Sequence, residues 1–197
     1  WCALHHRDDR LPIQPVVPNL FLLKGHQMLK TKIKLNLGER LLCRGIASAR
    51  YKTARKAGVK NSRVGNQSDV ETDLEGVAAE LAFAKFYGKY PSGVFDLGAR
   101  SSKNGEDKDG DISINGLVID VKATKYARGR LIAAEWKDHD SIDYYALVVG
   151  EFPEYEVKGL MSSKDLIVED RLKTLPRGTN KVYQAEQHEL YFPEELY

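Results

Sequence analysis

Apolar and polar residues alternate with a period of two on both sides of Asn115-Gly116. An Asn-Gly pair between two such runs is the strongest short-range signal for a β-hairpin, because a type I′ turn needs two residues that tolerate positive φ. The alternation places one set of side chains on each face of the hairpin. The apolar face would hold Ile112, Ile114, Leu117, Ile119 and Val121, and the other face Asp111, Ser113, Val118, Asp120 and Lys122.

Two segments before the hairpin carry apolar residues at helical spacing. The first spans residues 39–57. The second opens on the capping-box pattern Thr72-Asp73-Leu74-Glu75, which accounts for Glu75, and ends at Gly88. Shorter patterns predict strands over 94–99, 131–135 and 144–149 and a helix over 162–166, whereas 182–196 is ambiguous. This order predicts an α/β (or α+β) fold with a mixed central β-sheet flanked by helices.

Charge is distributed unevenly along the chain, although the net charge is only +2. Residues 1–63 hold 14 Lys and Arg against 3 Asp and Glu, a balance of +11, and residues 64–197 have a balance of −9. A basic block suggests a polyanionic partner; the alternative is a basic helix that pairs with the acidic part of its own fold. We therefore expect an arm or fusion remnant over 1–20, a basic helical extension over 21–70 and a core over 71–197.

Composition excludes several classes of protein. The hydrophobic content of 42% and charged content of 29% are ordinary for a globular protein, and no apolar run approaches the 18 residues of a membrane span. The two cysteines form no disulfide framework, so we expect an intracellular, cytoplasmic location. The five histidines lack zinc-site spacing, and the sequence contains no Walker loop or dinucleotide fingerprint.

The two-residue turn places Asp111 opposite Asp120 on neighbouring strands. Like charges that face each other across a ladder destabilise a sheet, so the arrangement makes sense if a cation lies between them. Mg²⁺ prefers oxygen ligands of this kind. Lys122 points to the same side and adds an amine beside the site. The alternative is a solvated polar face with an Asp–Lys surface pair.

Glu80 lies on the apolar stripe of the second predicted helix, among Val77, Phe83 and Tyr87. A carboxylate in such surroundings is costly unless it is paired or bound to a cation. We therefore weigh Glu80 as a further metal ligand against an edge position with its carboxylate in water.

A helix with a Glu, then an Asp, then Asp-x-Lys on a hairpin resembles the PD-(D/E)XK nuclease superfamily, which includes restriction endonucleases, Holliday-junction resolvases and many phage nucleases. The likeness covers about residues 73–150. The segment 120–124 looks like the (D/E)-x-K strand and Asp111 like the first Asp, although Gly110 stands in place of the family's Pro and Asp109 is a rival for that role. The resemblance implies a restriction-endonuclease-like fold.

The resemblance also implies chemistry and partners. Asp111, Asp120, the Val121 carbonyl and Glu80 would hold Mg²⁺ or Mn²⁺, and Lys122 would complete the catalytic set. The substrate would be DNA, cleaved by an endonuclease that could be structure-specific, as in phage recombination or repair. A junction resolvase would act as a homodimer. A restriction-type nuclease and a non-catalytic nucleic-acid-binding protein are the alternatives.

Two basic segments are candidates for contacts with DNA phosphates. Lys125, Tyr126, Arg128 and Arg130 directly follow the predicted site and form either a phosphate-contact loop or a solvated turn. Such contacts supply affinity without reading sequence. The basic helix adds Arg50, Lys52 and Arg55. Trp136 and Lys137, at the end of the next predicted strand, are weaker candidates.

Overall fold

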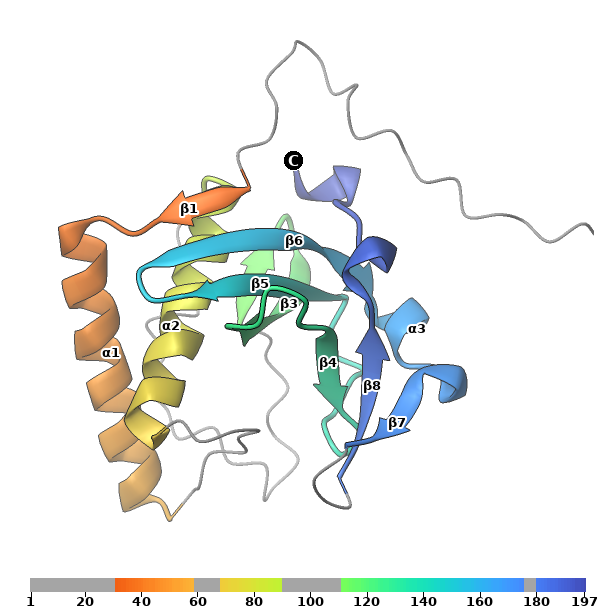
Figure 1. The fold of residues 1–197 in the computed structure, drawn as a ribbon, viewed down its shortest axis with the longest axis horizontal. Helices are drawn as coiled ribbons and strands as arrows, with labels where there is room; N and C mark the ends of the chain where they lie inside the picture. Colours follow the sequence, from red (N-terminus) through yellow and green to blue (C-terminus); the bar gives the residue numbers. More distant parts are fainter. Residues whose placement is uncertain (1–30, 59–67, 90–110, 176–179) are drawn as a thin grey trace, which may run out of the picture.

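The computed structural model describes residues 31–58, 68–89, 111–175 and 180–197. Within these ranges a curled, mixed five-stranded sheet has the strand order β1-β6-β5-β3-β2 (Figure 1). Only β3 and β5 are parallel neighbours in it. The strands are β1 (Lys32–Lys34), β2 (Ile112–Ile114), β3 (Leu117–Thr124), β5 (Tyr144–Glu151) and β6 (Glu154–Ser162).

A second, antiparallel sheet has the order β4-β8-β7. Its strands are β4 (Leu131–Ala134), β7 (Leu172–Thr174) and β8 (Lys181–Ala185). The helices are α1 (Leu37–Lys56), α2 (Asp69–Phe86) and the short α3 (Ser163–Leu166), with 3-10 turns at Glu169–Arg171, Gln187–Glu189 and Glu194–Leu196. The predicted α/β class with a mixed sheet flanked by helices is confirmed at this level.

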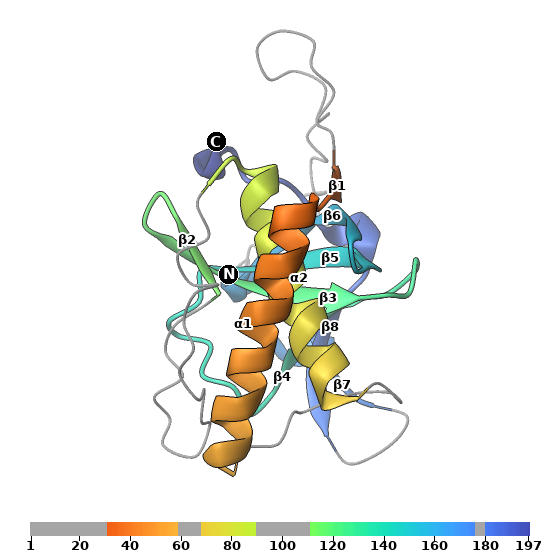
Figure 2. The same ribbon diagram turned by 90° about the vertical axis from the view of Figure 1, so that its left-hand side faces the viewer.

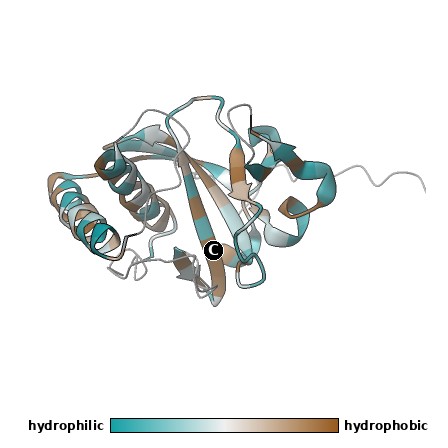
Figure 3. Ribbon diagram, turned by 90° about the horizontal axis from the view of Figure 1, so that it is seen from below, coloured by the Kyte–Doolittle hydropathy of each residue, from teal (hydrophilic) through white to brown (hydrophobic). Residues whose placement is uncertain are grey.

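The elements form layers. Helix α2 covers one face of the five-stranded sheet and α1 lies outside α2, whereas β4, β7 and β8 lie on the other side (Figures 2 and 3). One core fills the space between α1, α2 and the sheet and contains Cys43, Phe83, Ile119 and Val121. A second core, around Tyr145 and Leu147, joins the two sheets. Strand β3 therefore faces a different layer on each side.

The hairpin has the predicted turn. Asn115 and Gly116 have φ of 53° and 84°, as a type I′ turn requires. The register pairs Ile114 with Leu117 and Ile112 with Ile119. Because side chains alternate along a strand, Ile119 and Val121 face the helices, while Val118 packs against the second core and Asp120 and Lys122 share its side of the sheet.

The predicted capping box of α2 is wrong by one turn. Ser68 is the N-cap: its hydroxyl accepts from Glu71 N at 3.3 Å, and the Glu71 carboxylate accepts from Ser68 N at 2.8 Å. Glu75 lies one turn beyond Glu71, and its carboxylate accepts hydrogen bonds from the Tyr155 hydroxyl at 2.6 Å and from Phe152 N at 3.1 Å. Glu75 thus ties α2 to the β5–β6 hairpin and does not cap.

Strands β4 and β5 and helix α3 occur where they were predicted, whereas β1, β6, β7 and β8 were not predicted. The expected strand over 94–99, together with Asp109 and Gly110, lies outside the described residues. The boundary expected between residues 70 and 71 falls inside α2. Helix α1 also shares a core with α2 and the sheet, so it is a layer of that unit.

The connection between the parallel strands β3 and β5 supplies part of the candidate site. Parallel neighbours need a crossover, and it usually contains a helix. Here the crossover spans 125–143 and contains β4, which pairs with β8 in the other sheet. The segment that follows β4 returns to β5 and brings Lys137 and His139 to the face of β3 that carries Asp120.

Candidate active site

Asp120 is the central residue of the candidate site. Its register partner on β5 is Tyr145, and only 1% of Asp120 is exposed. Lys122 Nζ lies 2.6 Å from Asp120 Oδ1, and the Lys137 ammonium donates to Asp120 Oδ2. Burial alone would raise the pKa of Asp120, but attraction by Lys122 and Lys137 outweighs burial and holds it well below the ordinary value. Asp120 is therefore an ionised, buried carboxylate.

Asp111 lies at the edge of the sheet, just before β2. Its backbone N–H donates to the Ile119 carbonyl at 2.8 Å, and its Oδ2 accepts from Val121 N at 2.8 Å. The Asp111 carboxylate thus accepts the hydrogen bond from Val121 N that a backbone carbonyl would accept if the β2–β3 ladder continued. The expected direct opposition of Asp111 and Asp120 is not among the ladder pairs, which end at Ile112 and Ile119. The reason is this side-chain hydrogen bond, which replaces the next rung.

Even so, the Asp111 and Asp120 carboxylates both act on the Tyr145 phenol. The pKa of the Tyr145 phenol is raised, first by burial and then by the negative charges of Asp120, Asp138 and Asp111. The Val121 carbonyl leaves β3 on the same side as the Val121 N–H, which is the side that Asp111 occupies. Asp111 and the Val121 carbonyl therefore lie on one side of β3 where β2 begins, and Asp120 lies on the face of the sheet that it shares with Tyr145.

This set of oxygen donors suits a hard divalent cation, because Mg²⁺ is commonly held by one or two carboxylates together with other oxygens. Asp120 Oδ1 is buried and receives no well-directed hydrogen bond within the described structure, although the Lys122 ammonium lies close. Both oxygens of Asp120 thus have an ammonium close by, Lys122 at Oδ1 and Lys137 at Oδ2. In the described ranges no group of three or more His, Cys, Asp or Glu side chains is placed to hold a metal ion, so the candidate ligands are Asp111, Asp120 and the Val121 carbonyl.

Glu80 does not join them. It lies on α2, and its carboxylate forms a two-pronged ion pair with Arg50 of α1. Helix α2 packs on the face of β3 that carries Ile119 and Val121, and Asp120 points to the other face. The structure therefore places Glu80 in the helical layer and gives no support to its predicted role as a ligand. The physical reason is that the cation this buried acid required is Arg50.

The predicted DNA-contact residues fall into two groups. Arg50 and Arg55 are engaged by carboxylates of α2, Arg55 through Asp69 at 3.0 Å. Arg130 Nε pairs with Glu186 at 2.7 Å. These contacts support the alternative in which basic residues pair within the fold. The remaining residues, Lys52, Lys125, Tyr126 and Arg128, are exposed. The pKa of the Glu71 carboxyl is lowered mainly by its hydrogen bonds with Ser68, and the positive charge of Lys125 lowers it further.

The sequence predicts Lys137 only as a weaker candidate for phosphate contact, and it does not predict His139 or Tyr145 as site residues. Lys137 reaches Asp120 across 17 positions of the chain. His139 Nδ1 lies 2.6 Å from the Tyr145 hydroxyl, and burial, followed by the positive charge of Lys137, lowers the pKa of His139. Tyr145 lies within the apolar run of β5 and therefore resembles an ordinary core residue in the sequence. The signal for Lys137 was its position shortly after the predicted strand that follows the site.

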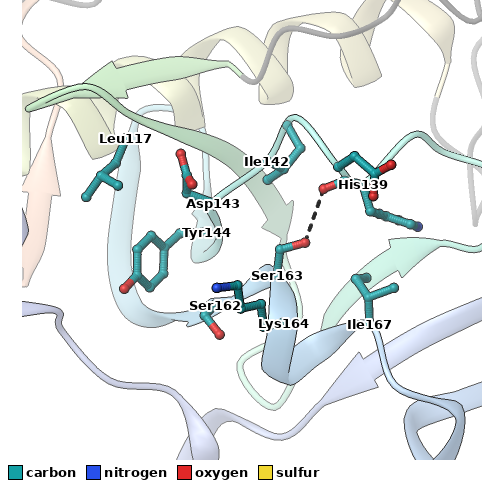
Figure 4. A pocket seen from close by; sticks show the side chains of 10 residues that line it. Leu117, His139, Ile142, Asp143, Tyr144, Ser162, Ser163, Lys164 and Ile167 are labelled. Carbon is teal, nitrogen blue, oxygen red and sulfur yellow. Dashed lines mark hydrogen bonds between the residues drawn. The ribbon is translucent and has the colours of Figure 1, made fainter.

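A cavity of about 480 Å³ lies beside this site. The first residues of β3 and β5, Leu117 and Tyr144, line it, and so does Ser163, whose hydroxyl donates to the His139 carbonyl at 3.3 Å (Figure 4). Asp120, Lys122 and Lys137 do not line it. The cavity is thus separate from the predicted site, with His139 between the two.

The chain belongs to DUF5843, a family of unknown function, whose model matches residues 25–170. No curated protein and no solved structure matches it. In the described part of the chain, no helix has both the length and the apolar character needed to cross a bilayer.

Proposed function

We propose that this protein is a metal-dependent DNA endonuclease with a site of the PD-(D/E)XK type on a restriction-endonuclease-like fold. The observation that carries the proposal is the ionised, buried Asp120 on the interior strand β3, with Lys122 on the same face. A buried ion pair often contributes little net stability, because apolar residues of similar size in its place can leave the fold equally or more stable. Strongly perturbed carboxylates of this kind cluster at functional sites.

The chemistry follows from the donors. Asp111, Asp120 and the Val121 carbonyl would hold Mg²⁺ or Mn²⁺, which supplies a Lewis acid for the scissile phosphate and lowers the pKa of the attacking water. Lys122, held 2.6 Å from Asp120 Oδ1, would orient that water or offset the charge that builds on the phosphate. Loss of one such preorganised donor typically costs a factor of about 10²–10³ in rate.

Exposed cations around the site favour a polyanionic substrate. Lys125 and Arg128 lie in the loop that follows β3, with the exposed aromatic ring of Tyr126 between them. Trp136, also exposed, directly precedes Lys137. Cations bind phosphates and aromatic faces stack on unpaired bases, so we favour a DNA substrate with single-stranded or branched regions. Cleavage of a symmetric four-way junction would require a homodimer.

Cleavage of supercoiled plasmid and of a four-way junction in Mg²⁺ tests the proposal. We expect Asp120→Asn to abolish cleavage and Lys122→Met to reduce it about 10²–10³-fold. Asp170→Asn, an exposed acid on a 3-10 turn, is the matched control and should cleave like the unmodified protein. Equal cleavage by Asp120→Asn and the unmodified protein would reject the proposal. Thermal melting of each variant confirms that it is folded.

The second candidate is a non-catalytic nucleic-acid-binding protein. The observation that favours it is that protein groups already compensate both carboxylates, Asp120 through two lysines and Asp111 through Val121 N–H. In that case DNA binding would persist in EDTA and no metal would bind. Neither the unmodified protein nor Asp120→Asn would cleave DNA, and the substitution would only lower stability.

A further inference from the structure

Asp120 has two ammonium partners that differ in how they are held. Lys122 is on β3 itself, two residues from Asp120, and 31% of its side chain is exposed. Lys137 comes from the segment between β4 and β5, and 16% of its side chain is exposed. Lys137 N–H donates to the Ala134 carbonyl in the turn that ends β4. One lysine is therefore part of the sheet, and the other is part of a connection.

A divalent cation cannot simply add to this arrangement. Both oxygens of Asp120 already have an ammonium close by, and the residue is almost completely buried. A third cation against the same carboxylate would face two positive charges in a poorly solvated site, where like charges repel strongly. Binding of a metal to Asp120 therefore requires one ammonium to leave.

Lys137 is the amine that can leave at lower cost. Its neighbour Trp136 is 58% exposed, so the turn that carries Lys137 reaches solvent and its side chain can swing out into water. Lys122 lies on β3 where that strand pairs with β5, opposite Leu147, and its ammonium lies 6.0 Å from the centre of the Tyr145 ring. The strand keeps Lys122 at the site with or without a metal.

On the basis of the proposed function, we propose that Lys137 occupies the position of the metal in the metal-free protein and that a divalent ion displaces it. The ammonium neutralises Asp120 until Mg²⁺ arrives, so the buried carboxylate is never left without a cation. Lys137 then lowers the apparent affinity for the metal, because each binding event must break the Lys137–Asp120 pair.

Lysine acetylation with a water-soluble acetylating reagent, mapped by mass spectrometry, tests the exchange. Lys137 should react slowly in the metal-free protein and several-fold faster in saturating Mg²⁺, whereas Lys122 and the exposed Lys164 should change little. In Asp120→Asn, Lys137 should react quickly in both conditions. If Lys137 is equally protected with and without Mg²⁺ while calorimetry shows that the ion binds, the exchange is wrong and the proposed function stands.

Calorimetric titration with Mn²⁺ gives an independent measurement. Lys137→Met removes the competing cation and should bind Mn²⁺ about tenfold tighter or more, whereas the control Lys164→Met removes an equal charge from an exposed site and should leave the affinity unchanged. Unchanged or weaker binding by Lys137→Met would overturn the exchange. If no variant, nor the unmodified protein, binds Mn²⁺ or Mg²⁺, the proposed function fails with it.

Discussion

Arg50 on α1 and Glu80 on α2 form a two-pronged ion pair, with Nη1–Oε1 and Nη2–Oε2 distances of 3.0 and 3.1 Å. Both side chains are largely buried, with 14% and 7% exposed. The pair joins the two helices that cover one face of the sheet. The pair also explains why Arg50, a predicted DNA contact, and Glu80, a predicted metal ligand, are charged: each neutralises the other.

Glu80→Ala should therefore destabilise the protein by about 3–5 kcal/mol, since removing one partner leaves a buried charge uncompensated. Urea unfolding measures the loss. The double variant Arg50→Met/Glu80→Leu should recover most of it, because both charges are then absent. Binding of Mn²⁺ should be unchanged in the double variant, and loss of Mn²⁺ binding there would restore Glu80 as a ligand.

Two substitutions of Asp111 should distinguish its structural role from its role in metal binding. Asp111→Asn keeps an oxygen that can accept from Val121 N–H, so the fold should be retained while Mn²⁺ binding weakens. Asp111→Ala leaves that buried N–H without its partner, which typically costs about 1–3 kcal/mol. Urea unfolding and calorimetry of both variants check this, and equal stability of the two would contradict the hydrogen bond's role.

Lys125 and Arg128 should contribute to DNA affinity through phosphates. For each phosphate that is no longer neutralised, the slope of log K against log salt should become less steep by about 0.9 on duplex DNA. The double variant Lys125→Ala/Arg128→Ala should therefore bind more weakly and with a shallower slope, as fluorescence anisotropy across a salt series would measure. Lys89→Ala, just beyond the opposite end of α2, is the control; an equal effect there would indicate non-specific attraction.

His139 should make stability depend on pH. Its folded-state pKa is lowered by burial and by Lys137, so between that value and the unfolded value of about 6.5 the unfolded chain binds more protons. Stability should therefore fall as the pH drops from about 7.5 to 5.5. The urea midpoint should fall less in His139→Gln, and the same pH slope in both proteins would contradict the assignment.

The hairpin was predictable because its signals are local. Asn115-Gly116 fixes the turn, and the alternation of apolar residues fixes the faces, so the position of Asp120 and Lys122 on one face followed from the sequence. Strand β6 carries the same kind of signal, since Tyr155 and Val157 are buried between Glu154, Glu156 and Lys158, and it could have been predicted in the same way.

The remaining features depend on contacts between distant segments. Lys137 meets Asp120 because a crossover returns it to β3, Glu75 accepts from Tyr155 80 positions away, and Arg50 meets Glu80 30 positions away. No local pattern encodes these partners. For Glu75 and Glu80 the sequence indicated that an acid needed an explanation, and only the packing of α1, α2 and the sheet supplied it.

A crystal soaked in Mn²⁺ shows whether Asp120 and Asp111 hold a divalent ion where β2 begins. We expect an anomalous peak within about 2.0–2.3 Å of oxygens of Asp111, Asp120 and the Val121 carbonyl, close to the contact distances of hard divalent ions, with the Lys137 ammonium displaced. A map with no peak there and both lysines still against Asp120 would contradict this expectation.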